Sequence, residues 1–384
     1  MSAATAPVGA TPGRPHVLHV SVPTSEGTAE VLLGYVREQL ARGWRVSVAC
    51  PSEGWLGYAA REAGAEVAWW RAGREPGVGT LEETARLSAL VTRLGPDLVH
   101  LHSSKAGLAG RLAVRRRVPT VFQPHAWSFQ AGSGTSSRLA LLWERFAVRW
   151  TDQVVCVGEG ERLVGEAAGV RAEVTVVPNG VDLRRFGPTS PEDRVEARAR
   201  LGLREAPTVV CVGRLSHQKG QDGLLDAWTS VLEAVPGAQL VLVGAGPDEA
   251  DLRRRASGLR GVVFAGARVD VPDWLSAADV VTVPSRYEGM ALAPLEAMAS
   301  GRSVVATDVP GIAEGVVDGV GALVPPGDPD ALAAALAERL LDPARADDEG
   351  WAGYDHVSAE RDAAEAARRV ARLSLGLMAS RNRA

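Results

Sequence analysis

The stretch Pro284-Ser-Arg-Tyr-Glu-Gly-Met-Ala-Leu-Ala-Pro-Leu-Glu-Ala-Met-Ala-Ser-Gly301 decides the organisation of the chain. It follows an apolar run that predicts a buried strand, and its first proline ends that strand because proline cannot donate to a sheet ladder. Pro294 suits the first turn of a helix and Gly301 suits a helix stop, so a short helix is expected over 295–300. Glu288 then lies in a glycine-containing loop, and Glu296 lies in the first turn of the helix.

The same loop and helix start offer a place for an anion. The first backbone N–H groups of a helix have no helical acceptor, and the helix dipole favours negative charge there. Two carboxylates beside such a place favour a ligand that carries both hydroxyls and phosphates, such as a nucleotide-sugar. The alternative is that Glu296 only offsets the helix dipole and that Glu288 is solvated.

The segment E-G-M-A-L-A-P-L-E-A-M-A-S-G, with seven residues between Glu288 and Glu296, resembles a family signature. It is similar to the E-x7-E motif of retaining glycosyltransferases of the GT-B fold, specifically polysaccharide-type members of glycosyltransferase family 4. The resemblance covers almost the whole chain and is strongest over 177–311. It implies an α/β fold of two Rossmann-like, doubly wound domains that face each other across a cleft. It also implies sugar transfer from a nucleotide-sugar, with a UDP-sugar favoured, to a hydroxyl of a glycan, lipid-linked or small-molecule acceptor.

Composition and charge agree with an ordinary globular enzyme of two domains. The chain has 384 residues, and its formal charge of −4 argues against a nucleic-acid partner. The three cysteines lie in strand-like runs without metal-ligand spacing, and such sparse usage suits a reducing compartment. No apolar run approaches the ~18 residues that span a bilayer. Residues 1–14 are expected to be a disordered leader without a signal peptide's apolar core, so we expect a cytoplasmic protein.

Strand and helix patterns alternate along both halves, which predicts doubly wound parallel sheets. The expected division is an acceptor-binding domain over 15–178 and a donor-binding domain over 179–358. The resemblance implies that a last helix, over 359–384, returns to the N-terminal domain. Gly27 lies in the loop after the first strand, where such folds bind ligands. Thr28 stands where the family often has a second adjacent glycine, so the backbone need not approach a donor phosphate as closely.

Candidate acceptor residues follow two strands of the N-terminal half. The segments His102-Ser-Ser-Lys-Ala-Gly107 and Pro124-His-Ala-Trp-Ser-Phe129 resemble acceptor-domain loops of the family. The resemblance places His125 against the transferred sugar and makes His102, Lys105 and Trp127 acceptor-binding candidates. Each strand-end histidine, including His100, has the alternative of being packed and hydrogen-bonded.

Lys105 is one of only two lysines in a chain that otherwise uses arginine. It precedes an expected helix over 108–114, where a cation opposes the helix dipole. That placement favours a ligand anion, such as a phosphate on a lipid-linked acceptor. The alternative is a solvated lysine tolerated at small cost.

Arginines are frequent between residues 111 and 149, and Leu139, Leu142, Phe146 and Trp150 fall near one helical face. One interpretation is an amphipathic helix that buries this face in the core and leaves its arginines solvated. The other is docking of the N-terminal domain on an anionic membrane surface, at the inner face of the membrane.

The second half opens with linker chemistry and a cationic loop. The segment from Val177 to Pro188 resembles the family's interdomain N-G-V-D…F-x-P connection. Gly213-Arg-Leu-Ser-His-Gln-Lys-Gly220 matches the family's G-R-L-x-x-Q-K-G, on a loop between an expected strand and helix. Arg214 and Lys219 would clamp an anion there, since loop glycines and a helix start accompany them. The alternative is a pair of solvated cations.

The resemblance also implies roles for these residues. A front-face reaction would retain anomeric configuration, and the protein would stabilise charge growing on the leaving diphosphate. We expect Glu288 to hold sugar hydroxyls, Glu296 to hold the ribose, and no metal or other cofactor to be needed. The expected catalytic residues are His125, Arg214, Lys219 and Glu288. The expected donor-binding residues are Gly27, Gly213, Arg214, Lys219, Val269, Glu288, Gly289, Met290, Ala291, Leu292 and Glu296.

Three other functions are compatible with parts of this pattern. A sugar-nucleotide epimerase or a phosphorylase could use the same fold. An assay that compares transfer to an acceptor with release of epimerised free sugar separates these functions from a glycosyltransferase. A non-catalytic nucleotide-sugar-binding subunit is opposed by the intact charged motifs. A Rossmann oxidoreductase is disfavoured because Glu249 occupies the place of the third glycine in G-x-G-x-x-G.

Overall fold

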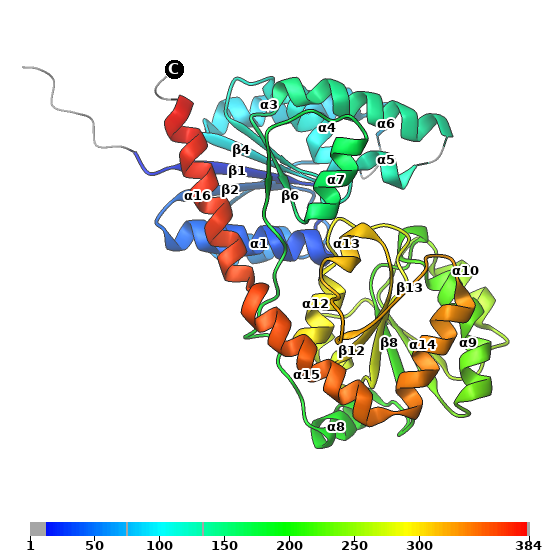
Figure 1. Ribbon diagram of the computed structural model, residues 1–384. Helices are drawn as coiled ribbons and strands as arrows, with labels where there is room; N and C mark the ends of the chain where they lie inside the picture. The colour runs from blue at the N-terminus through cyan, green and yellow to red at the C-terminus, as the bar shows by residue number, and fades with distance from the viewer. Residues whose placement is uncertain (1–12, 74–75, 133, 382–384) are drawn as a thin grey trace, which may run out of the picture.

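The computed structural model describes residues 13–73, 76–132 and 134–381. Within them the chain forms two α/β halves, each built on one parallel sheet (Figure 1). The predicted leader over residues 1–14 lies, apart from its last two residues, outside the described part of the chain.

The N-terminal half contains a seven-stranded parallel sheet in the order β3-β2-β1-β4-β5-β6-β7. This order places the first strand near the middle, which is the doubly wound arrangement expected from the alternating sequence pattern. The central strands are buried along almost their whole length because both faces of the sheet are covered by helices. The strands are β1 (His16–Ser21), β2 (Arg45–Cys50), β3 (Glu66–Trp69), β4 (Leu98–His102), β5 (Thr120–Gln123), β6 (Gln153–Cys156) and β7 (Val174–Val176).

The helices of this half connect successive strands and leave their N-termini at the carboxyl edge of the sheet. They are α1 (Glu26–Ala41), α2 (Leu56–Glu62), α3 (Thr80–Leu94), α4 (Ser103–Val114), α5 (Ser128–Ala131), α6 (Gly134–Ala147) and α7 (Glu159–Ala167).

The C-terminal half repeats the architecture with six parallel strands in the order β10-β9-β8-β11-β12-β13. Its strands are β8 (Thr208–Val212), β9 (Gln239–Val243), β10 (Val262–Gly266), β11 (Val280–Val283), β12 (Ser303–Thr307) and β13 (Gly321–Val324). Its helices are α8 (Pro191–Leu201), α9 (Gln221–Ala234), α10 (Glu249–Ala256), α11 (Val271–Ser276), α12 (Leu292–Ala299), α13 (Pro310–Ala313) and α14 (Pro329–Leu341).

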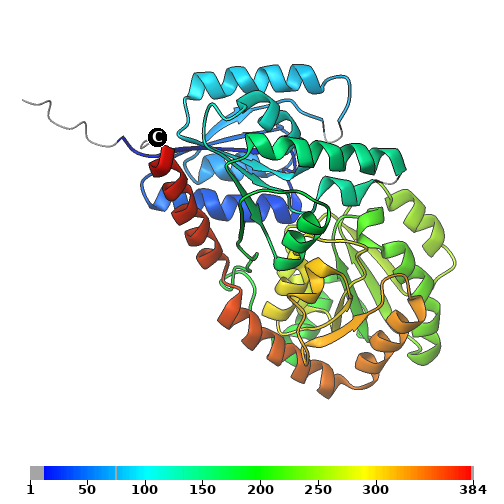
Figure 2. The ribbon, with the colours of Figure 1, turned by 45° about the horizontal axis from the view of Figure 1, so that its top comes forward.

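The end of the chain connects the two halves. Helix α15 (Pro343–Glu360) packs on the C-terminal sheet, and α16 (Ala363–Arg381) packs on α1 of the N-terminal half (Figure 2). A backbone bridge between Val181 and Asp362 holds the break between the two helices beside the interdomain linker. The apolar face of α16 joins the N-terminal core through Ala367, Val370, Ala371 and Met378.

Two expected helix starts are wrong by several residues. Helix α12 begins at Leu292, because Ala291 is extended and Pro294 is tolerated within the first turn, so Glu296 lies in the second turn. Helix α4 begins at Ser103, so Lys105 lies inside the helix instead of before it. The expected stop of α12 is confirmed, since Gly301 has a φ of +69° directly after the last turn.

The amphipathic helix does not bury its apolar face in the core as one interpretation expected. It is α6, and on it Leu139 and Leu142 are 62% and 58% exposed and Phe146 is 40% exposed. No helix among the described residues is both long enough and apolar enough to cross a bilayer.

Candidate active site

The cationic loop and the glutamate loop meet at the carboxyl edge of the C-terminal sheet. Lys219, at the end of the short 3-10 helix η2 (His217–Lys219), places its Nζ 2.6 Å from Oε1 of Glu288. The Glu288 side chain is only 7% exposed, whereas the Lys219 side chain is 22% exposed. Neither residue is therefore simply solvated, which excludes that alternative for both.

Three residues that the motif analysis did not assign hold these loops together. Gln218 donates from Nε2 to the carbonyl of Tyr287 at 3.1 Å, beside Glu288. Arg286 makes a bidentate ion pair with Asp222 of α9, at 2.9 and 2.7 Å. Because a two-point guanidinium contact fixes orientation, this pair ties the glutamate loop to the start of α9.

Arg214 points toward the other half of the molecule. Its Nε lies 3.7 Å from a carboxylate oxygen of Glu26, and its guanidinium reaches Gln218 at 3.4 Å. Glu26 has a φ of +70°, and the next residue, Gly27, sits so close to Leu292 that an added Cβ would lie 3.4 Å from its side chain. The start of α1 and the start of α12 thus lie next to each other where the two halves meet.

The backbone before α12 is held from both halves. Asn179 of the linker donates from Nδ2 to the carbonyl of Met290 at 2.9 Å, and the Ala291 N–H donates to the carbonyl of Gly311. Gly289 must be a glycine, because an added Cβ would lie 2.8 Å from the backbone nitrogen of Ala126. The Ala291 N–H, one of the groups expected to face a phosphate, is therefore already engaged.

Glu296 is half-buried on α12, and burial raises its pKa to about 7, although nearby Arg185 and Lys219 act in the opposite direction. Arg185 pairs with Glu30 of α1 at 2.7 Å and donates to the carbonyl of Val269 at 3.1 Å. The Val269 side chain is exposed. Arg185 thus connects α1 of the N-terminal half to the loop after β10.

On the N-terminal side, the backbone at His125 and Ala126 is strained, with φ values of +55° and +99°. The Ala126 N–H donates to Oε1 of Glu161 at 2.6 Å, and Glu161 is buried. Strained non-glycine backbone persists only where surrounding contacts hold it, and it is frequent at active sites. His125 itself is half-buried, next to Gly289 of the C-terminal half.

Three of the four expected acceptor residues are buried. His102 is fully buried, and Trp127 is 2% exposed, with its indole N–H donating to the carbonyl of Glu161. Lys105 is 4% exposed and pairs with Glu83 at 2.7 Å, so it is neither a solvated lysine nor a side chain open to the cleft. Of these four candidates, His125 is the one whose side chain is not buried.

Known proteins match this chain over both halves. The family described as "Glycosyl transferases group 1" matches residues 206–342, and the "Glycosyl transferase 4-like domain" matches residues 26–180. Anabaena HepE in complex with UDP-glucose has the same fold, with a TM-score of 0.81, 25% identity, and coverage of 93% of this chain and 98% of that one.

Two curated relatives are similar over shorter stretches. The GDP-mannose-dependent monoacylated alpha-(1-6)-phosphatidylinositol monomannoside mannosyltransferase of Corynebacterium glutamicum is 40% identical over 48% of this chain and 51% of its own length. The UDP-Gal:alpha-D-GlcNAc-diphosphoundecaprenol alpha-1,3-galactosyltransferase of Escherichia coli is 33% identical over 56% of this chain and 58% of its own length. The chain thus spans a little over half the length of these relatives. With the double sheet and the matches to both halves, the chain belongs to the group 1, family 4 glycosyltransferases of the GT-B fold.

Proposed function

We propose that the protein is a retaining glycosyltransferase that moves a hexose from a nucleotide-sugar to a hydroxyl of a lipid-linked or small acceptor. The observation that carries the proposal is the Lys219–Glu288 pair, which Gln218 connects to Arg214, the cation that approaches Glu26 of the N-terminal half. A cation for the diphosphate and a carboxylate for sugar hydroxyls lie within 2.6 Å of each other. A nucleotide-sugar has its diphosphate and its sugar hydroxyls next to each other, at the bond that breaks.

Lys219 and Arg214 would share the negative charge that grows on the diphosphate as the sugar leaves. Glu288, oriented by Lys219 and by the Arg286–Asp222 pair, would hold hydroxyls of the transferred sugar. The first turn of α12 adds a helix N-terminus to the same anion site. Because protein groups supply the positive charge, we expect activity to persist in excess EDTA.

The relatives differ in the nucleotide of the donor: the name of one specifies GDP-mannose and the name of the other specifies UDP-Gal. Thermal unfolding in the presence of UDP-, GDP- and dTDP-sugars tests the proposal and identifies the base, because a ligand that binds the folded state raises Tm. We expect one nucleotide series to raise Tm, and the shift to be lost in Lys219→Ala. No shift with any nucleotide-sugar would contradict the proposal.

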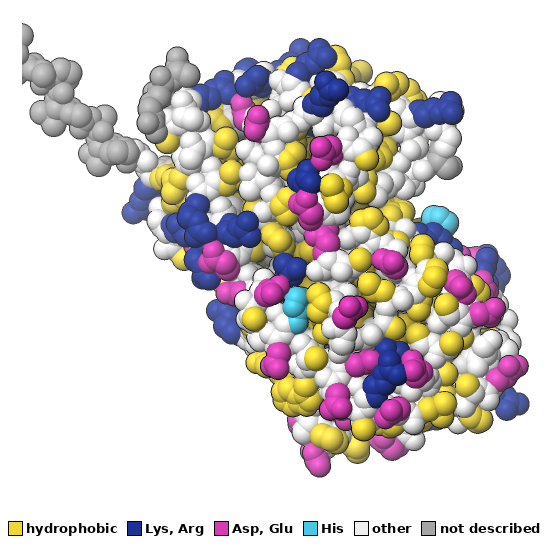
Figure 3. Space-filling model, viewed as in Figure 1, with side chains coloured by type: hydrophobic (Ala, Val, Ile, Leu, Met, Phe, Trp, Pro, Cys, Tyr) yellow, Lys and Arg dark blue, Asp and Glu magenta, His cyan; other side chains and the backbone are white. Residues whose placement is uncertain are grey.

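We infer further that α6 docks the N-terminal half on an anionic membrane. The exposed Leu139, Leu142 and Phe146 lie among exposed arginines at 115, 138, 145 and 149, and Arg149 stacks over Phe146 at 3.7 Å. Figure 3 shows basic and apolar side chains intermixed along the upper edge of this half. Helices that lie on a membrane surface usually insert apolar side chains among the lipid headgroups, while neighbouring cations contact the lipid phosphates. The acceptors in both relatives' names are lipids, and a lipid acceptor here would bring the active site to such a surface.

Vesicle co-sedimentation tests the docking. We expect binding to phosphatidylcholine vesicles that contain phosphatidylglycerol, weaker binding at high salt, and loss of binding when Leu139 and Leu142 are both changed to serine. Leu341→Ser, which changes a leucine 64% exposed on the C-terminal half, is the matched control. Equal binding of both variants would contradict the assignment to α6.

A further inference from the structure

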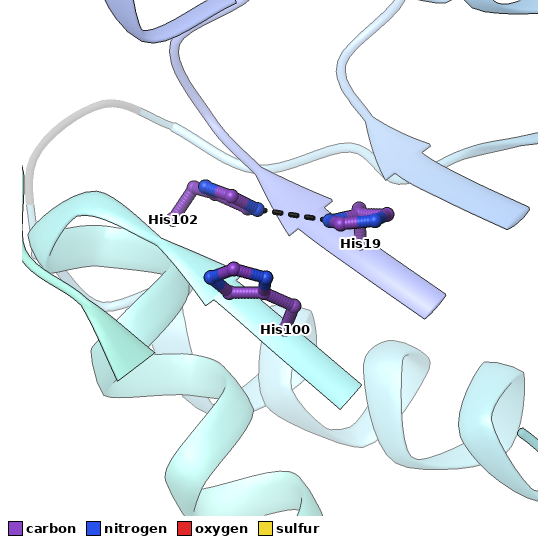
Figure 4. A group of neighbouring side chains, drawn as sticks. All are labelled: His19, His100 and His102. Carbon is purple, nitrogen blue, oxygen red and sulfur yellow. Dashed lines mark hydrogen bonds between the residues drawn. The ribbon is translucent and has the colours of Figure 1, made fainter. Parts of the chain in front are cut away.

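A group of buried histidines lies beneath His125, at the carboxyl ends of β1 and β4. His19, His100 and His102 each offer a ring nitrogen within 4.8 Å of the others, and all three are fully buried (Figure 4). His100 and His102 point to the same face because they are two residues apart on one strand, and His19 pairs in register with His100 on the neighbouring strand. Such a group could bind a metal ion or form a hydrogen-bonded chain.

The ring geometry favours the hydrogen-bonded chain. Nδ1 of His19 lies 3.0 Å from Nε2 of His102, and the two ring centroids are 5.3 Å apart. Nδ1 of His102 lies 3.2 Å from Nε2 of His125, with centroids 5.5 Å apart. In both pairs the centroid separation is about the nitrogen separation plus the two distances from ring centre to nitrogen. The lone pair of one ring therefore points straight at the facing nitrogen, as an N–H···N bond requires.

A shared metal ion does not fit these orientations. An ion between two imidazoles must sit on the lone-pair axis of each, and at about 2.0–2.1 Å from each nitrogen it cannot lie between rings that face each other in line at 3.0 Å. His100 stacks face to face on His102, with centroids 4.1 Å apart, so the two lone-pair directions run side by side and do not converge. His100 thus packs against the chain without joining it.

The chain continues to an anchor on α1. Nε2 of His19 lies 2.9 Å from Oε1 of Gln39, which is fully buried. Burial lowers the pKa of His19 to about 4 and that of His125 to about 3, and it places the pKa of His102 well below its ordinary value. All three rings are therefore neutral near pH 7, and each has one N–H and one lone pair.

We propose that the chain Gln39–His19–His102 fixes the tautomer of His125, so that His125 presents an unprotonated Nδ1 as a hydrogen-bond acceptor. The Gln39 carbonyl oxygen accepts from Nε2–H of His19, which leaves the Nδ1 lone pair of His19 to accept from Nε2–H of His102. Nδ1 of His102 then accepts from Nε2–H of His125. His19, His102 and Gln39 are positioning residues, which act on the reaction only through His125.

The consequence for the reaction rests on the proposed function. With its tautomer fixed, His125 would accept a hydrogen bond from a sugar hydroxyl and could not donate one to a glycosidic or phosphate oxygen. Because the tautomer of His125 is fixed before the substrate binds, no free energy would be needed to select it at each turnover. It also explains why His102, which cannot itself touch a ligand, lies directly behind the strained His125 backbone.

Histidine-selective ¹⁵N NMR of the full chain tests the tautomers without any substrate. We expect His19, His102 and His125 to be neutral Nε2–H tautomers at pH 7, and His125 to become a mixture in Gln39→Met, which keeps the volume and removes the acceptor. His16→Gln is the control, because His16 is a buried histidine of β1 that bonds to Ser47 and takes no part in the hydrogen-bonded histidine chain. An Nδ1–H tautomer at His125, a tautomer unchanged in Gln39→Met, or a stoichiometric metal in the purified protein would overturn the proposal.

Kinetics give a second readout. In Gln39→Met we expect kcat to fall by about two- to ten-fold, the effect of one weakened hydrogen bond, while nucleotide-sugar binding followed by Tm is unchanged. The His16→Gln control should change neither. If the protein proves to transfer no sugar, the NMR result still decides the tautomer of His125. A failure of the proposed function is therefore distinguishable from a failure of the proposed histidine chain.

Discussion

In the C-terminal half the two cations of the site, Arg214 and Lys219, come from the segment between β8 and α9 and keep about a fifth of their side-chain surface exposed. In the N-terminal half the polar side chains at the equivalent sheet edge are buried, and they bond to one another instead of to solvent. The difference indicates two ways of preparing a site. One half offers charge to a ligand directly, and the other holds a single side chain, His125, in a fixed state.

The largest effect is expected from removing the loop cation. Lys219→Ala takes away a charge-assisted contact to the diphosphate, so kcat should fall by on the order of 10²-fold or more. Circular dichroism and Tm are measured alongside, because Lys219→Ala leaves the Glu288 carboxylate, only 7% exposed, without its cation and so lowers stability as well. Turnover equal to wild type at saturating donor would mean that the exposed cation is not part of the reaction.

The two glutamates sharpen the comparison within the C-terminal half. Glu288→Ala should mainly lower kcat, by about ten-fold or more, because the sugar it holds changes charge in the transition state. Glu296→Ala should mainly raise the donor KM, because a ribose contact is the same in ground and transition states. Steady-state kinetics with varied donor separate these outcomes, and equal changes in both variants would refute the division of roles.

Lys105 tests whether the buried polar groups of the N-terminal half are structural. Lys105→Met leaves the Glu83 carboxylate, only 13% exposed, without its cation, and should lower the free energy of unfolding by about 3 kcal/mol. Changing Glu83 to glutamine in the same chain should restore much of that loss. Urea unfolding measures both variants. Unchanged stability together with a raised acceptor KM would instead make Lys105 the acceptor residue that the sequence predicts.

The pH dependence of stability tests whether the buried Glu161 of the N-terminal half is also structural. Burial raises its pKa to about 7, so between about pH 4.5 and 7 the folded state holds a proton that the unfolded state has lost. Its contribution to stability is therefore complete below pH 4.5 and is lost as the pH rises through 7. Glu161→Gln should remove on the order of 2–3 kcal/mol of this pH dependence, measured as the difference from wild type at pH 5 and 7.5. Parallel stability curves for the two proteins would show that Glu161 stays ionised.

The residues of the C-terminal site were accessible to sequence reasoning because they lie on loops within one or two short motifs. Arg214, Lys219, Glu288 and Gly289 each fall where the pattern places them, and the alternation of strands and helices predicts both sheets. The start of α12 was predicted three residues late, because a proline in the first turn marks a helix start only approximately.

What the sequence could not predict are contacts between elements distant in the chain. Nothing in the spacing indicates that Glu83 of α3 meets Lys105, or that Gln39 of α1 meets His19. Trp127 is an acceptor-binding candidate by its motif, but its ring packs against Gly165 of α7, where a Cβ added to the glycine would lie 2.6 Å from the ring. Such pairings depend on topology and packing, which a motif does not contain.

The central claim is that this cleft transfers a sugar with retention of configuration. Proton NMR of wild-type protein with the nucleotide-sugar that most raises Tm tests it most directly. It follows the anomeric signal of the sugar as the sugar passes to water or to an added acceptor and the nucleoside diphosphate leaves. The account predicts a first-formed product with the anomeric configuration of the donor, and about 10²-fold slower release with Lys219→Ala. An inverted product, or an epimerised sugar without transfer, would contradict it.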